Sequence, residues 1–515
     1  MTPGHKGQIG QKGHKRQETA PSQLCCVLCV LYVLYVPSRT GAEALMFQQP
    51  QEATESWRRK IPSPSPAGQF KLPATKELKL DNGLTIVLVE DHRSPLVTIE
   101  AGIPIAPRQS LARAALSNFV ALSESTAELL TEGAGSRTGS ELAREVESLG
   151  GRIASSVNED YAEVSAVAVS ENAHRMIELF ADVLLRPTFP QSEVALYKSN
   201  RVERLKVQRQ DPAFLVDEMF DKAVYGSHPY SLSVPTPQAV RAVTRLKIER
   251  FYRSNFAPEG SAIVIAGDFD LLKTETTLRE LFSRWKSLAA HQSVREVNLR
   301  NGAARKIYLI DRPGSEQADF RIGRLAVKRG DPDYFALSVA NAIVGAGTAS
   351  RLFLNIREKK GYAYDVSSSI SALKQAGTFF GASQTRTDVT VAAIKEMLAE
   401  LDRIGEEKVS DQEMRDAKSF LTGQFALGLS TQGGVAGRLL HARVLGLAPD
   451  YLENYRARVG EVTSDRVRQV ARRYIASKTS VIVVVGDARK LTKGLRGIGP
   501  VVVFNAEGRR LLQPK

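Results

Sequence analysis

The chain has 515 residues, of which 43% are apolar and 24% charged, and its formal net charge is +14. This composition is typical of a folded globular protein and excludes a membrane-embedded helix bundle or a largely disordered chain. The length exceeds what one hydrophobic core usually serves, so it indicates two domains of about 200 residues each.

The positive charge raises the question of a nucleic-acid partner. Lysine and arginine are scattered through predicted amphipathic helices, and no basic stripe interleaved with aromatic residues occurs in the sequence. We therefore expect no nucleic-acid partner. A solvated basic surface, suited to anionic lipid or acidic peptides, is the simpler interpretation.

The N-terminus has the layout of an export signal. The basic stretch HKGQIGQKGHKRQ (5–17) precedes 13 consecutive apolar residues (24–36), and small residues follow at Ala42 and Ala44. This order predicts a signal peptide over 1–44 and a secreted protein, in a bacterial periplasm. The alternatives are an uncleaved segment that tethers the protein to a membrane, and a true start at Met46.

All three cysteines, Cys25, Cys26 and Cys29, lie inside this leader. A mature chain from about residue 45 would then contain none. It could form no disulfide, no thiolate metal site and no cysteine nucleophile.

The first half of the chain is predicted at 71–286, after a proline-rich linker or strap at 45–70. Two strands flank an Asp-Asn-Gly turn at 81–83, and DYAEVSAVAV (160–169) is a half-buried strand. A capping box at Thr138 and Glu141 starts a helix that stops at Gly150 and Gly151. The remaining expected elements are helices at 112–130, 172–185, 191–209, 213–223 and 237–252, and a strand at 260–269.

The second half is predicted at 305–505, after a linker at 287–304 and before a tail at 506–515. A second capping box at Ser410 and Glu413 begins the latter of two long helices. The glycines of STQGGVAGR (430–438) indicate a hinge or turn. The other expected elements are strands at 305–313, 318–327, 376–384 and 480–488, helices at 332–345 and 463–475, and a turn, helix and strand within 347–370.

The two halves repeat one another at a fixed offset. Gly267 and Gly486, each followed by aspartate, are 486 − 267 = 219 residues apart. Asn82 and Asn301, each followed by glycine, are separated by the same 301 − 82 = 219 residues. Two matches at one offset, with a similar order of elements between them, predict a duplicated domain.

Four stretches of this duplicated chain resemble the insulinase / mitochondrial-processing-peptidase family of zinc metallopeptidases. They are NGLTIVLVEDHRSPLVTI (82–99), LLRPTF (184–189), GSHPYS (226–231) and REKKGYAY (357–364), and the resemblance covers about residues 70–505. It implies an α+β fold with two homologous half-domains. Each would be a mostly antiparallel sheet of about six strands covered on one side by helices.

The chemistry implied by the resemblance depends on a His-x-x-Glu-His helix, whose two histidines reach one zinc ion while the glutamate activates water. Alignment on Gly133 puts Glu124, Ala127 and Glu128 at these positions. Alignment on Asp211 and Pro212 puts Arg204 where the third zinc ligand belongs. The histidines lie at 5, 14, 92, 174, 228, 291 and 441, so no two are four apart. We therefore expect no metal and no catalytic residue in this chain by itself.

The replaced positions leave two interpretations of Glu124 and Glu128. They could contribute to a hard-cation site, which needs about six oxygen ligands, or they could be ordinary surface glutamates. A sharper hypothesis is that Arg204 forms a bidentate ion pair with Glu128.

The second half retains another feature that the resemblance makes relevant. In the family, an arginine and a tyrosine seven residues later bind the substrate backbone and stabilise the oxyanion, and Arg357 and Tyr364 have this spacing (364 − 357 = 7). The alternative is that Arg357 only ends a helix and Tyr364 only fills a strand, with Tyr362 as a competing tyrosine. His228, alone before a proline, is interpreted as a loop packing residue.

The resemblance implies a function in which the work is divided between two chains. We expect a non-catalytic, substrate-binding subunit of a secreted heterodimeric zinc metallopeptidase, with peptides or unfolded segments as substrate and zinc held by a homologous partner subunit. The alternatives are a structural or scaffolding homologue without a peptidase role, and an active hydrolase that uses unrecognised residues. The sequence leaves a homodimer open.

Overall fold

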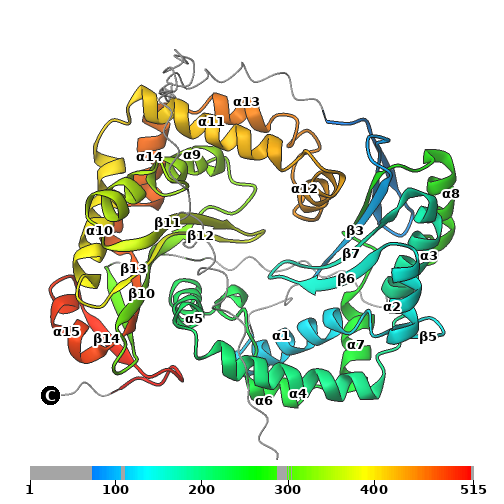
Figure 1. Ribbon diagram of the computed structural model, residues 1–515, viewed down its shortest axis with the longest axis horizontal. Helices are drawn as coiled ribbons and strands as arrows, with labels where there is room; N and C mark the ends of the chain where they lie inside the picture. The colour runs from blue at the N-terminus through cyan, green and yellow to red at the C-terminus, as the bar shows by residue number, and fades with distance from the viewer. Residues whose placement is uncertain (1–71, 106–110, 287–298, 300, 303, 512–515) are drawn as a thin grey trace, which may run out of the picture. The chain divides into compact units, whose positions relative to one another are not determined.

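The computed structural model describes residues 72–511 except 106–110, 287–298, 300 and 303 (Figure 1). The predicted leader at 1–44 and strap at 45–70 lie outside the described residues, as does most of the predicted linker. The described residues belong to one compact unit. None of the helices in this part of the chain is long and apolar enough to cross a membrane.

The first half builds a six-stranded sheet in the order β1-β2-β8-β3-β7-β6. Only the β2–β8 pair is parallel. All six residues of β8 are buried, as expected for a central strand covered on both faces. The strands are β1 Thr75–Lys79, β2 Thr85–Glu90, β3 Leu96–Pro104, β6 Arg152–Val157, β7 Tyr161–Val169 and β8 Ala262–Gly267.

The second half builds a six-stranded sheet in the order β11-β12-β10-β13-β9-β14. Here the β13–β9 and β9–β14 pairs are parallel and the other three are antiparallel. The strands are β9 Lys306–Asp311, β10 Gln317–Ala326, β11 Ala363–Ala372, β12 Gly377–Arg386, β13 Val481–Gly486 and β14 Val501–Phe504.

The two sheets confirm the predicted α+β fold and its repetition. Five strands follow the same spatial order, because β2, β8, β3, β7 and β6 correspond to β9, β13, β10, β12 and β11. The sixth position differs. In the first sheet it holds β1, which precedes β2 in the chain, and in the second it holds β14, the last strand.

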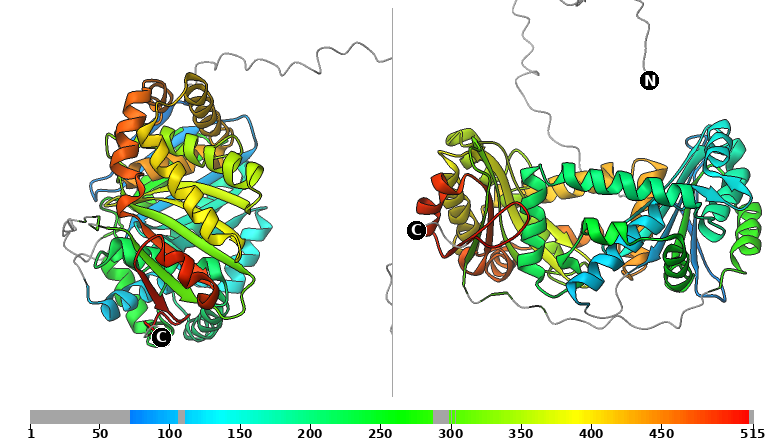
Figure 2. Two further views of the ribbon diagram at one scale, coloured as in Figure 1. Left: turned by 90° about the vertical axis from the view of Figure 1, so that its left-hand side faces the viewer. Right: turned by 90° about the horizontal axis from the view of Figure 1, so that it is seen from below.

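Helices pack against one face of each sheet, as predicted (Figure 1 and Figure 2). On the first sheet these include α2 Gly139–Ser148, α3 Ala173–Leu185 and α8 Leu271–Phe282. On the second they include α9 Tyr334–Val344, α10 Thr390–Glu406 and α14 Ser464–Tyr474. The remaining described α-helices are α1 Arg113–Glu128, α4 Gln191–Gln208, α5 Pro212–Tyr225, α6 Pro237–Arg241, α7 Arg245–Asn255, α11 Asp411–Leu427, α12 Gln432–Val444, α13 Tyr455–Gly460 and α15 Ala488–Arg496.

The opposite face of each sheet is covered by a helix from the other half. Helix α12 of the second half packs on β3 and β8, and α5 of the first half packs on β13 and β10. Each contact is part of a buried apolar cluster that joins the two halves. The halves therefore complete one another, and neither sheet is fully covered by its own half.

Two sequence predictions are wrong. The expected helix at 237–252 is two helices, because Thr244 is extended and its hydroxyl accepts a hydrogen bond from Lys247 N at the start of α7. The glycines at 430–438 do not form a hinge: Thr431 caps α12, and Gly433, Gly434 and Gly437 lie within it. The elements without a prediction include β6, β14, α8, α13 and α15, whereas both capping boxes are confirmed.

Two glycines allow α12 to lie close to β3. On α12, a Cβ on Gly437 would be 3.3 Å from Glu100 Oε2, whereas one on Gly433 would make ordinary contact, 3.8 Å from Thr98 Oγ1. On the strand side, a Cβ on Gly102 would be 2.6 Å from Val444 Cγ2. Small residues on both elements thus set the spacing of this contact between the halves.

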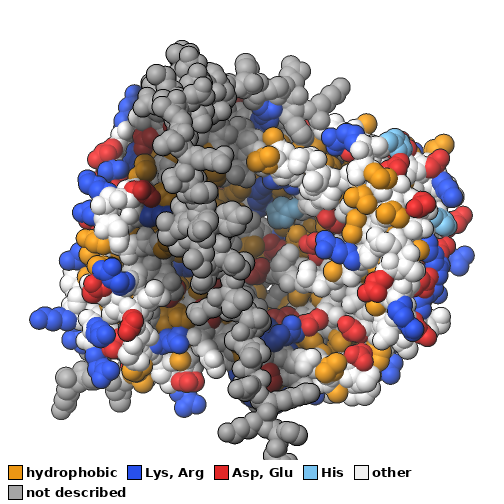
Figure 3. Space-filling view, viewed as in Figure 1, with side chains coloured by type: hydrophobic (Ala, Val, Ile, Leu, Met, Phe, Trp, Pro, Cys, Tyr) orange, Lys and Arg blue, Asp and Glu red, His pale blue; other side chains and the backbone are white. Residues whose placement is uncertain are grey.

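Charge is distributed rather than concentrated on the face shown in Figure 3. Basic and acidic side chains of the described residues alternate there without a patch of one sign. The net charge of +14 is therefore not gathered into one basic surface on this face.

Candidate functional site

Helix α1 carries the positions that the sequence analysis identified as a lost metal motif. Ala127 is 1% exposed, so its methyl group is part of the core, and its carbonyl accepts a hydrogen bond from Ser155 Oγ on β6. A methyl group can neither activate water nor bind a metal. The two carboxylates of Glu124 and Glu128 face helix α4, which supplies their partners.

Glu124 forms a buried bidentate ion pair with Arg201. Arg201 Nε donates to Glu124 Oε2 at 2.9 Å, and Nη2 donates to Oε1 at 3.0 Å. The side chains are only 10% and 19% exposed. Burial raises the pKa of Glu124, and the hydrogen bonds from Arg201 oppose that rise. Arg201 also donates to Gln208 Oε1 at 3.0 Å, which fixes the guanidinium on both sides.

Glu128 pairs with Arg204, as the sequence hypothesis proposed. Arg204 Nη2 donates to Glu128 Oε1 at 2.6 Å. The structure gives this pair one hydrogen bond, so the bidentate geometry expected here belongs instead to Glu124 and Arg201. Both side chains are about half exposed, at 51% and 47%, which makes this the weaker pair.

These residues do not fit a zinc ion. The two carboxylates are already paired with guanidinium groups, and a positive charge at a ligand position repels a cation. Within the described residues there is no group of three or more His, Cys, Asp or Glu side chains that could hold a metal. In the structure these four side chains form two ion pairs.

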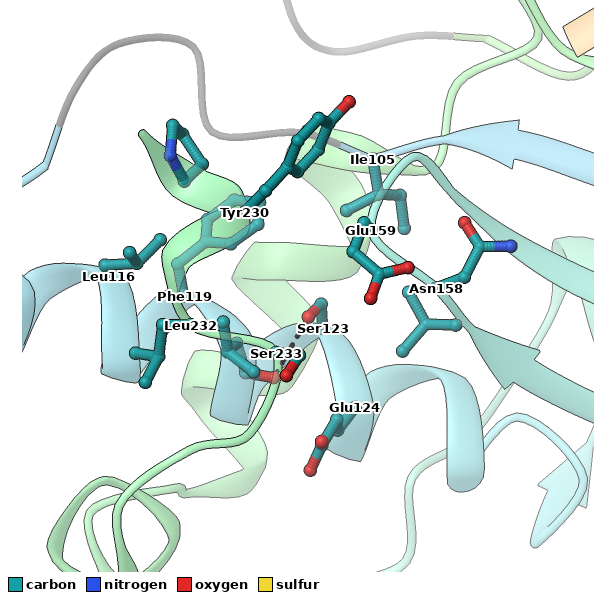
Figure 4. Close-up of a pocket in the computed structure, with 13 residues that line it drawn as sticks. Ile105, Leu116, Phe119, Ser123, Glu124, Asn158, Glu159, Tyr230, Leu232 and Ser233 are labelled. Carbon is teal, nitrogen blue, oxygen red and sulfur yellow. Dashed lines mark hydrogen bonds between the residues drawn. The ribbon is translucent and has the colours of Figure 1, made fainter. Parts of the chain in front are cut away.

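Two pockets border this cluster. One of about 660 Å³ is lined by Glu128, Arg204, Tyr197 and neighbouring residues of α4. The Tyr197 hydroxyl is buried without a hydrogen-bond partner among the described residues. The second, of about 90 Å³, lies between α1, the β6–β7 turn and residues 229–233, with Phe119, Glu124 and Leu232 in its lining (Figure 4).

The predicted Arg357 and Tyr364 pair lies in the second half, separate from the α1–α4 cluster. The Arg357 guanidinium carbon is 4.8 Å from the centre of the Tyr364 ring and 4.6 Å from that of Phe353. Tyr364 is 84% exposed. The two residues thus contact one another, and the phenol faces solvent.

The local backbone at this pair is irregular on both sides. Arg357 lies in the π-helix Phe353–Lys359, a geometry that is often associated with functional sites. Tyr364 lies on β11, an edge strand, where the pairing with β12 shifts register between Ala363 and Val366. Such irregularities re-aim side chains, and an edge strand offers unpaired backbone groups.

His228 is a packing residue, as interpreted from the sequence. It is 1% exposed, and its Nδ1 accepts a hydrogen bond from Tyr230 N at 3.2 Å. Burial lowers the pKa of this histidine. Its ring caps the short turn Pro229–Ser231 and packs against the rings of Tyr225 and Tyr230.

Arg201 is the site residue that the sequence analysis missed. It lies three residues before Arg204 on α4, just as Glu124 lies four before Glu128 on α1. Two basic residues one helical turn apart on α4 match two acidic residues one turn apart on α1, and this matching spacing could have predicted a second ion pair.

Comparison with family descriptions gives two consecutive matches. Residues 126–238 match the description "Insulinase (Peptidase family M16)", and residues 242–421 match "Peptidase M16 inactive domain". The first match begins inside α1, after Glu124.

Several curated bacterial proteins are similar over most of the chain. An uncharacterized zinc protease of Streptomyces coelicolor is 27% identical over 361 residues, 69% of this chain and 78% of its own. An uncharacterized zinc protease of Mycobacterium leprae is 25% identical over 71% of this chain and 82% of its own. One from Bacillus subtilis is 23% identical, over 70% and 86%.

Solved structures share the fold. A peptidase M16 inactive domain from Pseudomonas fluorescens has a TM-score of 0.74 at 24% identity, over 80% of this chain and 98% of its own. A protease from Helicobacter pylori has the same TM-score at 18% identity, over 81% and 100%.

Fold and site together define a protein of the metallopeptidase class with two repeated α+β halves, in which helix α1 has no paired histidines. The chain belongs to the insulinase family of peptidases, family M16, and residues 242–421 match that family's inactive domain.

Proposed function

We propose that this protein is the substrate-binding, non-catalytic subunit of a secreted heterodimeric zinc peptidase. Its homologous partner subunit would hold the zinc, and its substrates would be peptides or unfolded segments. The observation that supports the proposal most is the difference between the α1 carboxylates and the pair of Arg357 and Tyr364. Glu124 and Glu128 are paired with arginines, whereas Arg357 and Tyr364 remain in contact with each other and Tyr364 is exposed.

The chemistry of the exposed pair supports this role. A guanidinium and a phenol both donate hydrogen bonds, so together they can hold a peptide carbonyl and stabilise the oxyanion that develops from it. The adjacent edge strand β11 has backbone groups to which an extended peptide could add as a further strand. The zinc-bound water that attacks the carbonyl would come from the partner.

The test uses the complex that co-purifies with the tagged full-length protein from the organism that produces it. We expect this complex to contain zinc and a homologue with a His-x-x-Glu-His motif, and to cleave unfolded peptides. Tyr364→Phe should lower kcat by about 10²–10³-fold with the complex intact, since one oxyanion donor is lost.

Tyr362→Phe is the matched control and should leave cleavage unchanged, because it removes the same atom two residues away. Arg415→Ala, on the exposed surface of α11, is the control for Arg357→Ala. Full activity in both Arg357→Ala and Tyr364→Phe would favour a scaffolding role. Cleavage by the isolated chain, abolished by a chelator, would overturn the proposal altogether.

A further inference from the structure

Helix α15, the last helix of the described chain, is basic on its outward side. Its apolar residues are buried, and the helix packs on β9, β14 and the start of α10. The cationic side chains on it are all exposed, and they are Arg489, Lys490, Lys493 and Arg496. The ammonium groups of Lys490 and Lys493 have no ion-pair partner among the described residues.

The turn that follows β14 adds two more cations beside α15. Arg509 and Arg510 are exposed, and the chain folds back on β14 there, with Leu511 N donating to Val503 O at 2.9 Å. Helix α15 and β14 lie side by side and face the viewer in the left-hand view of Figure 2. We call the four cations of α15 together with Arg509 and Arg510 the C-terminal basic surface.

This surface accounts for a large share of the charge of the protein. Residues 488–511 contain six basic residues and one acidic residue, Glu507, so their net charge is 6 − 1 = +5 out of +14 for the whole chain. The side of the molecule that carries them is at a right angle to the face of Figure 3, on which both signs alternate.

The carboxylates at the start of α15 are used by the backbone. Asp487, whose side chain is 1% exposed, accepts a hydrogen bond from Arg489 N at 3.0 Å and lies 3.6 Å from Arg489 Nε. Asp311 accepts one from Ala488 N at 2.9 Å. Both carboxylates are thus bound at the beginning of the helix, and α15 itself contains no acidic residue.

The surroundings of these cations favour a lipid surface over other anionic partners. Within 488–511 no large apolar side chain is exposed, so a protein partner would find no apolar centre for an interface. For the same reason no exposed aromatic ring is present there to stack on a nucleic-acid base. Adsorption to anionic headgroups requires only clustered cations. The apolar run at 24–36, outside the described residues, also predicts a chain that is handled at a membrane.

We propose that the C-terminal basic surface binds the anionic phospholipid headgroups of a membrane. Because the apolar side of α15 is already packed against the protein, the helix lies on the headgroups without inserting. Each lysine or arginine held near such a surface raises the affinity about fivefold. The binding is therefore electrostatic and sensitive to salt. This inference does not depend on Tyr364 or on peptide cleavage, so it can fail or succeed separately from the proposed function.

The test measures co-sedimentation of the full-length protein with vesicles. One set contains phosphatidylcholine alone, and the other contains phosphatidylcholine and phosphatidylglycerol in equal parts. We expect tighter binding to the anionic set at about 0.1 M NaCl and no preference at about 1 M, because the Debye length falls from about 10 Å to about 3 Å. Insertion of the apolar N-terminal segment would not depend on the headgroup, so the preference reports on charge. Equal binding to both sets at the lower salt concentration would overturn the proposal.

Paired variants locate the binding surface. Lys490→Gln combined with Lys493→Gln should lower affinity for the anionic vesicles by about 10–30-fold. The melting temperature should hold, because both side chains are exposed. The control combines Lys273→Gln with Lys286→Gln, which removes the same charge from exposed positions of the first half and should have little effect. Equal losses in the two double variants would assign binding to net charge and remove the site. Binding of single-stranded DNA at the salt concentration that releases the vesicles would replace the lipid by a nucleic acid.

Discussion

At the scale of single residues, the two ion pairs between α1 and α4 differ in what they contribute. The pair of Glu124 and Arg201 is shielded and bidentate, whereas that of Glu128 and Arg204 is half exposed with a single hydrogen bond. A charge left alone in a shielded site is far costlier than one at the surface. The stability of this region therefore depends mainly on Glu124 and Arg201.

Glu124→Gln should lower the free energy of unfolding by about 3–5 kcal/mol, because it leaves the Arg201 cation without its counter-charge. Glu128→Gln is the matched control and should cost about 0–1 kcal/mol. The measurement is urea unfolding followed by circular dichroism. Similar losses in both variants would contradict the assignment of Arg201 to the buried pair.

The sequence predicted part of this cluster. Alignment with the family pattern at Gly133 and at Asp211 and Pro212 was enough to pair Arg204 with Glu128, because the resemblance puts both residues at metal-ligand positions. It did not distinguish Arg201 from the other basic residues of α4. That distinction depends on the distance between two helices, which no single helix encodes.

At the scale of elements, the three glycines of α12 have different surroundings. A Cβ on Gly433 would meet only Thr98, at 3.8 Å, which is ordinary contact. A Cβ on Gly434 would be 2.3 Å from the carbonyl oxygen of Gly428, a backbone atom that cannot turn aside. The need for glycine is therefore specific to position.

Gly433→Ala should stabilise the protein by up to about 1 kcal/mol, since alanine favours the helical state. Gly434→Ala should destabilise it by about 1–3 kcal/mol, because the turn between α11 and α12 must move. Urea midpoints of the two variants give the comparison. Equal effects of the two substitutions would show that α12 does not begin as described.

The same glycines explain why α12 was predicted as a turn. Glycine disfavours an isolated helix, and local propensity gave no reason to expect one at 430–438. Packing against β3 reverses that preference. The capping boxes at Thr138 and Ser410 were predictable because their hydrogen bonds join residues only three apart.

At the scale of the whole molecule, each half supplies a helix that the other half's sheet needs. The repeat offset predicted two similar halves. It did not predict that α5 would pack on the sheet of the second half and α12 on the sheet of the first. These contacts join residues far apart in the chain. A polar contact adds to them: Asp160, at the β6–β7 turn, accepts a hydrogen bond from Lys374 N at 2.9 Å.

Residues 71–286 expressed alone should not give a stable monomer, because β3 and β8 would expose the apolar face that α12 covers. Co-expression with 305–505 should restore a soluble one-to-one complex. Size-exclusion chromatography and circular dichroism test this, with the full chain cleaved at an inserted protease site in 287–304 as the control. A folded, monomeric first half would contradict it.

Because α12 of the second half covers the sheet of the first half, that face of the sheet stays open for part of the time in which the chain is synthesised. The last strand of the first sheet ends at Gly267 and its covering helix ends at Val444, so 444 − 267 = 177 further residues must be made before that face is closed. At about 5–20 residues per second this takes on the order of 10–35 s. For all of that interval the nascent chain carries an open apolar face at the ribosome, where a chaperone or an export apparatus can engage it.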